Sequence, residues 1–259
     1  MITSNPFDAL PLWALFLLTV LMALLAAEGG YRLGLAWRER RPEEKEGAIG
    51  TMTGATLGLL AFLVAFVTSM AVSRFDNRRQ LVIDEADSIG TTWLRAGYLD
   101  EPYRTEIRDL LRDYVDIRIH LPNLARLAEV RSRSEQIHGE LWSRAEAVAR
   151  QNPDSTTAAL FISSLNDTID LHTKRSIALT AGRLPETILI GIFLVAFLAM
   201  ALLGFQNSFH GKRSEIALVG LVLVFSLLIL LIIDLDRPNE GLLRVSQQAM
   251  IDLQQQLHR

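Results

Sequence analysis

The sequence predicts an all-α integral membrane protein, with four transmembrane helices and a helical extramembrane segment between the second and the third. Asp, Glu, Lys and Arg make up 21% of the 259 residues, yet four windows contain none of them. These windows are Ala9–Ala27, Ala48–Val72, Thr187–Phe205 and Ile216–Ile233. A helix rises ~1.5 Å per residue, and a charge at mid-bilayer costs roughly 2.5–3.5 kcal/mol. Each window therefore predicts one span of a hydrocarbon core ~30 Å thick.

Residues 1–72 are expected to hold the first two spans, joined by a short basic loop. Trp13 and Tyr31 lie near the ends of the first span, where interfacial aromatic residues are typical. The leader Met1–Asp8 has no Lys or Arg, and the apolar run is longer than the core of a signal peptide. We therefore expect the first span to be retained.

Residues 73–185 are expected to form an extramembrane helical bundle. Apolar residues recur there at helical spacing, and Pro102, Pro122 and Pro153 separate the predicted helices. The segment holds 16 Lys and Arg against 17 Asp and Glu. This balance, together with a net charge of −3 for the whole chain, gives no support for nucleic-acid binding.

Residues 186–233 are expected to hold the third and fourth spans, and residues 234–259 a C-terminal amphipathic helix. Pro238 suits a first helical turn that follows Asp236. The apolar stripe of this helix would consist of Leu242, Val245, Met250 and Leu253.

An even number of spans places both termini and the helical segment on the same side of the membrane. The two short loops hold seven basic residues against three in the tails, which places the loops in the cytoplasm and the helical segment outside it. Counting the basic residues that flank spans two and three reverses the result. We expect the extracytoplasmic side for the helical segment, in a bacterial cytoplasmic (inner) membrane.

No residue pattern predicts an enzyme, a cofactor or a bound metal. The chain has no Cys, and its five His show no metal-ligand spacing. Phosphate-binding glycine loops, zinc-protease helix motifs and nucleophile elbows are absent from the sequence. Asp234, Asp236 and Glu240 could hold a hard cation, but Asp-x-Asp-Arg favours internal ion pairing, and we assign no metal there. The uncharged spans also argue against a proton-coupled or ion-coupled transporter.

The second span carries the residues that most suggest a function. Gly50, Gly54 and Gly58 recur every four residues, a spacing that lets another helix approach closely. Plain helix packing explains this pattern, and so does a helix that lines a central path. The same step continues through Phe62, Phe66 and Met70, which would form either an apolar constriction or ordinary lipid-facing and core side chains.

Basic residues follow this span at Arg74, Arg78 and Arg79. Basic side chains at the end of a span commonly extend to the membrane interface. In a ring of several subunits they would instead attract anions. The sequence leaves both interpretations open, because a ring requires oligomerisation.

Several of these segments together resemble the bacterial bestrophin-like domain family of membrane proteins, which is distantly similar to bestrophin anion channels. The matching segments are Arg74–Arg79, Asp84–Gly97 and a tail with Asp234-Leu-Asp-Arg-Pro238 and Gly241-Leu-Leu-Arg-Val-Ser-Gln247. The tail motif, with Asp234, Asp236, Arg237, Pro238 and Gly241, is the specific part. The resemblance implies a pentameric channel in which span two lines the pore and Phe62, Phe66 and Met70 form its neck.

Two hypotheses of function follow. The first is a homo-oligomeric, passive ion channel of bestrophin-like type for anions, whose partners are the lipid bilayer, further copies of the chain and small ions. The second is a non-catalytic structural or sensory membrane protein whose helical segment binds a partner.

Overall fold

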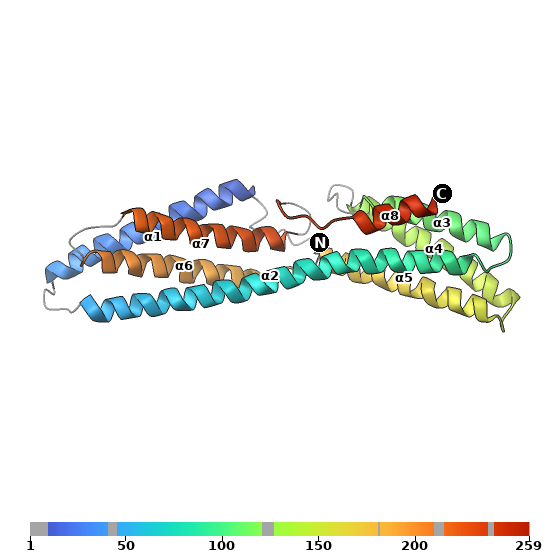
Figure 1. Ribbon diagram of the computed structural model, residues 1–259, viewed down its shortest axis with the longest axis horizontal. Helices are drawn as coiled ribbons and strands as arrows, with labels where there is room; N and C mark the ends of the chain where they lie inside the picture. The colour runs from blue at the N-terminus through green and yellow to red at the C-terminus, as the bar shows by residue number, and fades with distance from the viewer. Residues whose placement is uncertain are drawn as a thin grey trace. The chain divides into compact units, whose positions relative to one another are not determined.

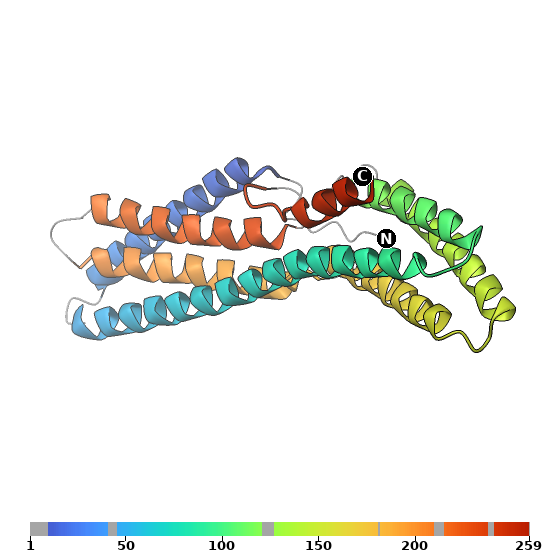
Figure 2. The same ribbon diagram turned by 45° about the vertical axis from the view of Figure 1, so that its right-hand side comes forward.

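The computed structural model describes residues 10–40, 46–120, 127–180, 182–209, 215–237 and 241–258, and these residues contain helices and no strand (Figures 1 and 2). The all-α prediction is confirmed. The helices are α1 (Leu12–Arg40), α2 (Glu46–Ala96), α3 (Tyr103–Arg118), α4 (Leu127–Gln151), α5 (Thr156–Thr180), α6 (Glu186–Asn207), α7 (Glu215–Asp236) and α8 (Gln248–Leu257). Among them α1, α2, α6 and α7 are long and apolar enough to cross a membrane, as predicted.

The chain forms two compact units. Unit 1 comprises Met1–Arg74 and Arg183–Leu243, and unit 2 comprises Phe75–Gly182 and Arg244–Arg259. Helix α2 contributes to both, because its apolar span continues into the charged segment without a proline to end it. Unit 1 thus holds the four spans, and unit 2 holds α3, α4, α5, α8 and the last part of α2.

In unit 1, helix α1 packs along α6 and α7 (Figure 1). Gly30 of α1 and Gly204 of α6 allow the closest approach. A Cβ atom on Gly30 would collide with the backbone of Ala201, and one on Gly204 would collide with the backbone of Ala27. Small residues at a helix crossing are typical of membrane proteins, where close van der Waals contact replaces hydrophobic drive.

In unit 2, α3 packs against α4 and α8, and α4 packs against α5 (Figure 2). Apolar side chains at helical spacing meet in a shared core. Its fully buried members include Ile89, Ile107, Leu111, Tyr114, Ile137, Leu141, Phe161, Leu165 and Met250.

The predicted start of the tail helix is wrong. Helix α8 begins at Gln248, and Leu242 and Val245 precede it in non-helical backbone. Gly241 has φ +147°, a conformation that L-residues rarely adopt and that cannot continue a helix. The packing stripe of α8 therefore starts at Met250, with Leu253 and Leu257.

We predict that Gly204→Ala destabilises the protein, because the added methyl group would meet the carbonyl group of Ala27 on α1. Overpacking of this kind costs about 1–3 kcal/mol. The melting temperature of the detergent-solubilised protein measures the effect. Gly220→Ala is the matched control, since a Cβ there meets no atom within 4 Å in the described structure. Equal melting temperatures for the two variants would contradict the packing at Gly204.

Candidate functional site

Helix α2 packs within unit 1 through one face and leaves the opposite face uncovered. Its buried side chains recur every three, four or seven residues, at Thr53, Leu60, Val64, Val67 and Ala71. This period matches the 3.6 residues of a helical turn, so one side of α2 packs against the rest of the unit.

The predicted neck residues lie on or beside the uncovered face. Phe62 is 66% exposed and Phe66 57% exposed, and their rings stack with centroids 6.5 Å apart. Met70 is half-buried at the edge of the same face. The structure thus groups the two phenylalanines as one exposed aromatic pair.

Two of the three predicted packing glycines also lie on the uncovered face. A Cβ atom on Gly54 or Gly58 would meet no atom within 4 Å in the described structure, whereas one on Gly50 would lie 3.2 Å from Nε2 of Gln206. Gly54 and Gly58 therefore make no close helix contact inside the described chain. No described residue makes use of the close approach that they permit.

The three basic residues after the span have different environments. The Nη1 atom of Arg74 donates to the carbonyl oxygen of Arg183 at 2.7 Å, and the side chain is half-buried. Arg78 is buried in unit 2. Arg79 is exposed, so it is the one of the three that presents its charge fully to the surface.

Asp234 of the tail motif holds the chain that follows α7. Its carboxylate accepts hydrogen bonds from the backbone amides of Leu242 at 2.8 Å and Leu243 at 3.1 Å. A Cβ atom on Gly241 would collide with this carboxylate, so glycine is required there for space as well as for its positive φ. Pro238 lies outside the described residues.

Asp236 and Arg237 tie other segments of unit 1 to the end of α7. The carboxylate of Asp236 accepts from the amide of Leu184 at 2.6 Å and from Nε of Arg183 at 3.3 Å. Arg237 donates from Nη2 to the carbonyl oxygen of Leu10 at 2.6 Å. The tail motif thus connects the chain before α1, the chain before α6 and the chain after α7. We call Asp234, Asp236, Arg237 and Gly241 the tail clasp.

Unit 2 contains a buried ionic cluster centred on Glu85, which lies on α2 beyond the uncharged span. Arg118 donates from Nε at 2.7 Å and from Nη2 at 3.0 Å to the two carboxylate oxygens. Arg175 donates from Nη1 at 2.5 Å. Burial alone would raise the pKa of Glu85, but the two guanidinium groups hold that pKa at about 2.

Three aromatic side chains extend this cluster, Tyr114, His138 and His172. The hydroxyl of Tyr114 donates to Glu85 at 2.7 Å, and the same oxygen lies 3.2 Å from Nδ1 of His172. The two imidazole rings meet edge to face with centroids 4.7 Å apart. Burial, together with the charge of Arg118, lowers the pKa of His138 to about 4 and that of His172 to about 3. Both rings are therefore neutral at pH 7.

The hydrogen bonds assign the tautomer of His172. Ionised Glu85 can only accept, so it takes the single hydroxyl proton of Tyr114. The oxygen of Tyr114 must then accept from Nδ1–H of His172, which leaves Nε2 of His172 as an acceptor.

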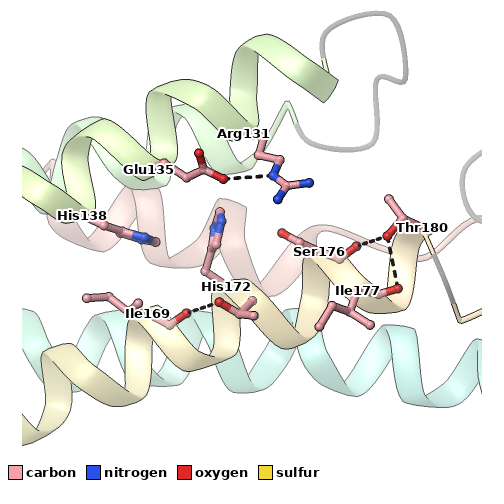
Figure 3. Close-up of a pocket in the computed structure, with 9 residues that line it drawn as sticks. Arg131, Glu135, His138, Ile169, His172, Ser176, Ile177 and Thr180 are labelled. Atoms are coloured by element: carbon pink, nitrogen blue, oxygen red, sulfur yellow. Dashed lines mark hydrogen bonds and ion pairs between the residues drawn. The ribbon is translucent and has the colours of Figure 1, made fainter. Parts of the chain in front are cut away.

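A pocket of about 260 Å³ between α4 and α5 reaches this cluster (Figure 3). His138 projects from α4 and His172 from α5 at one part of the pocket, as Figure 3 shows. Arg131 and Glu135 form an ion pair at 2.9 Å on the α4 side. Thr173 and Ser176 add hydroxyl groups, and Ile169 and Ile177 add apolar surface.

None of the sites predicted from the sequence includes Glu85, Arg118 or Arg175. All three continue the apolar stripes of their helices: Glu85 lies between Val82 and Ala86, Arg118 four residues after Tyr114, and Arg175 three residues after His172. A charged residue in register with an apolar stripe is the signal that could have identified them.

Comparison with known proteins relates the chain to one family. The profile of the Bestrophin-like domain matches residues 20–250. A search of curated proteins finds no match.

Among solved structures, a bacterial Bestrophin homolog from Klebsiella pneumoniae is similar over 94% of this chain and 96% of its own, with TM-score 0.65 and 16% identity. A single-substitution variant of that homolog gives TM-score 0.67 and 17% identity, with 95% and 97% covered. A further structure, described simply as a membrane protein carrying one substitution, gives TM-score 0.68 and 16% identity, also with 95% and 97% covered. These likenesses concern the fold.

We predict that Asp234→Ala releases the tail clasp, because the amides of Leu242 and Leu243 lose their acceptor. A hydrogen bond to a charged acceptor contributes about 1.5–3 kcal/mol. Hydrogen exchange of the peptide that contains residues 242–247 should become faster. Asp234→Asn keeps one side-chain oxygen and should show a smaller increase. Wild-type exchange in Asp234→Ala would contradict the clasp.

We also predict that the free energy of unfolding decreases as the pH is lowered from about 6.5 to about 4. His138→Phe should reduce this pH dependence. An unfolded histidine binds a proton below pH ~6.5, whereas His138 in the folded protein stays neutral until pH is about 4. Because the unfolded state binds more protons in this window, acid favours unfolding.

Melting temperatures between pH 7 and pH 4 measure this effect. His120→Phe is the control, since His120 is exposed at the end of α3 and lies outside the cluster. Identical pH profiles for wild type and His138→Phe would refute the assignment.

Proposed function

The chain belongs to the bestrophin-like domain family, and on that premise we propose that it assembles into a homo-oligomeric, passive channel for small anions. The observation that carries this proposal is the uncovered face of α2, which presents Phe62 and Phe66 together with Gly54 and Gly58. A ring of copies, five by analogy with bestrophins, would bring these faces together around one axis.

The chemistry of this face suits passive conduction. Stacked aromatic rings from several copies form an apolar constriction, and such a constriction gates ion flow by excluding water. The span has no acidic or basic residue that could relay a proton or couple transport to another ion. The energy for flux therefore comes from the ion gradient alone, and no catalytic step is needed.

The preference for anions rests on the similarity to bestrophins. Arg79 is the exposed basic residue that follows the span, and a ring of copies would repeat its charge around the axis. The apolar helical spans support a bacterial inner-membrane location, and the loop charges support placing unit 2 on the extracytoplasmic side.

We predict that purified protein in liposomes releases chloride faster than protein-free liposomes, and that Phe62→Ala with Phe66→Ala changes this rate at least severalfold. Removal of both rings takes apolar bulk away from the constriction, which lowers the barrier to a hydrated ion. Leu194→Ala is the matched control, because Leu194 is an exposed apolar residue of α6 rather than α2.

Three outcomes would overturn the proposal. One is a monomeric particle in detergent and in lipid. Another is flux of potassium without flux of chloride, which would reject the anion preference. The third is an equal change of rate in the α2 and α6 variants, which would show that the α2 face does not line the path.

A further inference from the structure

The chain that follows α7 returns to the last turn of that helix. The backbone amides of Leu242 and Leu243 donate to the carboxylate of Asp234, which lies two residues before the end of α7. Figures 1 and 2 show the segment after Gly241 beside this end of the helix. Asp234 is the first charged residue after the apolar window that ends at Ile233. Leu242 and Leu243 are therefore held at the edge of the hydrocarbon core rather than far beyond it.

Asp234 belongs to the uncovered face of α7. Val224, Leu227 and Leu231 on this face are 56%, 59% and 39% exposed, and they follow one another at helical spacing. Asp234 is the next position of the same stripe, seven residues after Leu227. It is nevertheless only 3% exposed, because the returning chain covers it. The returning chain thus lies on the apolar face that α7 turns away from the rest of unit 1.

The side chain of Leu242 extends this apolar face. Leu242 is 83% exposed and Leu243 41% exposed. The amide of Leu242 is fixed to Asp234, and Gly241 before it has the backbone conformation and the small size that the turn requires. A defined turn therefore presents a large apolar side chain outside the protein at the end of a span.

Trp13 lies at the same end of the spans. Arg237 donates from Nη2 to the carbonyl oxygen of Leu10, which joins the end of α7 to the chain before α1. Trp13 follows Leu10 by three residues, and Asp234 precedes Arg237 by three, so each lies ~4.5 Å further along its helix into the span. Trp13 is 68% exposed, and tryptophan at this position is typical of the lipid headgroup level. The end of the spans that carries Leu242 is therefore a membrane interface.

Lipid fits the uncovered face of α7 better than a second copy of the chain does. Close contacts between helices in a membrane favour small residues, as Gly54 and Gly58 provide on α2. The stripe of α7 that leads to Asp234 instead consists of the bulky side chains of Val224, Leu227 and Leu231. Such side chains are equally well placed in contact with lipid tails.

We propose that Leu242, with Leu243 beside it, inserts among the lipid acyl chains at the membrane interface and anchors the segment between α7 and α8 to the bilayer. Insertion removes apolar surface from water, which is favourable in proportion to the area removed. The amides of both leucines already donate to Asp234, so they enter the interface with their hydrogen bonds made.

This anchor is independent of the channel that we propose for α2. It requires that the spans lie in a bilayer, but it requires neither a ring of copies nor ion flux. A protein that conducts nothing and still inserts Leu242 would keep this inference and lose the channel. A conducting protein whose Leu242 stays in water would keep the channel and lose the anchor.

Fluorescence quenching in phosphatidylcholine liposomes tests the insertion. The sequence has no Cys, so Leu242→Cys gives the full-length protein a single site for a bimane label. Lipids with a nitroxide group near the headgroup should quench this label severalfold more strongly than lipids with the nitroxide near the chain end. Val224→Cys lies in the middle of the α7 span and should show the opposite order. Leu94→Cys is the matched control in water, because Leu94 is an apolar residue of unit 2 that is 68% exposed. Aqueous iodide should quench it, and neither lipid should.

Leu242→Ser tests the anchor without a label. The backbone amide of residue 242 binds Asp234, so the clasp itself does not need the leucine side chain. In liposomes, hydrogen exchange of the peptide that contains residues 241–247 should become severalfold faster, because the segment loses its contact with lipid. Leu94→Ser should leave this exchange unchanged.

Three results would overturn the proposal. Iodide quenching of the Leu242 label to the level of the Leu94 label would place it in water. Protection from iodide and from both lipids would show that protein, such as a second copy of the chain, covers this position. Wild-type hydrogen exchange in Leu242→Ser would show that the side chain anchors nothing.

Discussion

A charge that leaves water for a hydrocarbon or protein interior loses several kcal/mol of hydration, and this cost governs both units of the chain. Unit 1 avoids the cost, because its four spans contain no charged residue within their windows. Unit 2 compensates for it, because Glu85 is buried only in company with Arg118 and Arg175. The tail clasp is a third solution, in which the carboxylates of Asp234 and Asp236 accept backbone amide hydrogens. In the Glu85 cluster and in the tail clasp, a buried carboxylate is tied to specific donors.

Helix α2 carries two of these solutions in one element. Its span is apolar up to Val72, and the same buried face reaches Glu85 in unit 2. The continuity arises from the sequence, since Pro102 is the first proline after the start of the helix. As a result, the helix that we propose to line the path also holds the central acid of the ionic cluster.

The four spans could be predicted from the sequence because the absence of charge is a local property of each window. The uncovered face of α2 could not be predicted from the sequence, because it depends on the helices that pack against Leu60 and Val64. The Glu85 cluster joins residues that are 33 and 90 positions apart, and no local pattern pairs them. Pro238 suits a first turn and therefore predicts a tail helix that begins too early, whereas the side chain of Asp234 binds the following amides and prevents that turn.

The glycines on the uncovered face of α2 are stronger evidence for assembly than the apolar character of that face. Phe62 and Phe66 would be as well placed against lipid as against protein, because lipid tails are equally apolar. Gly54 and Gly58 are different. Glycine costs helix stability of about 1 kcal/mol relative to alanine, and against lipid it offers no contact in return. Inside the described chain these two residues touch nothing that requires their small size. A neighbouring helix that approaches closely would account for both, and the neighbour that every copy of this chain has at hand is another copy of itself.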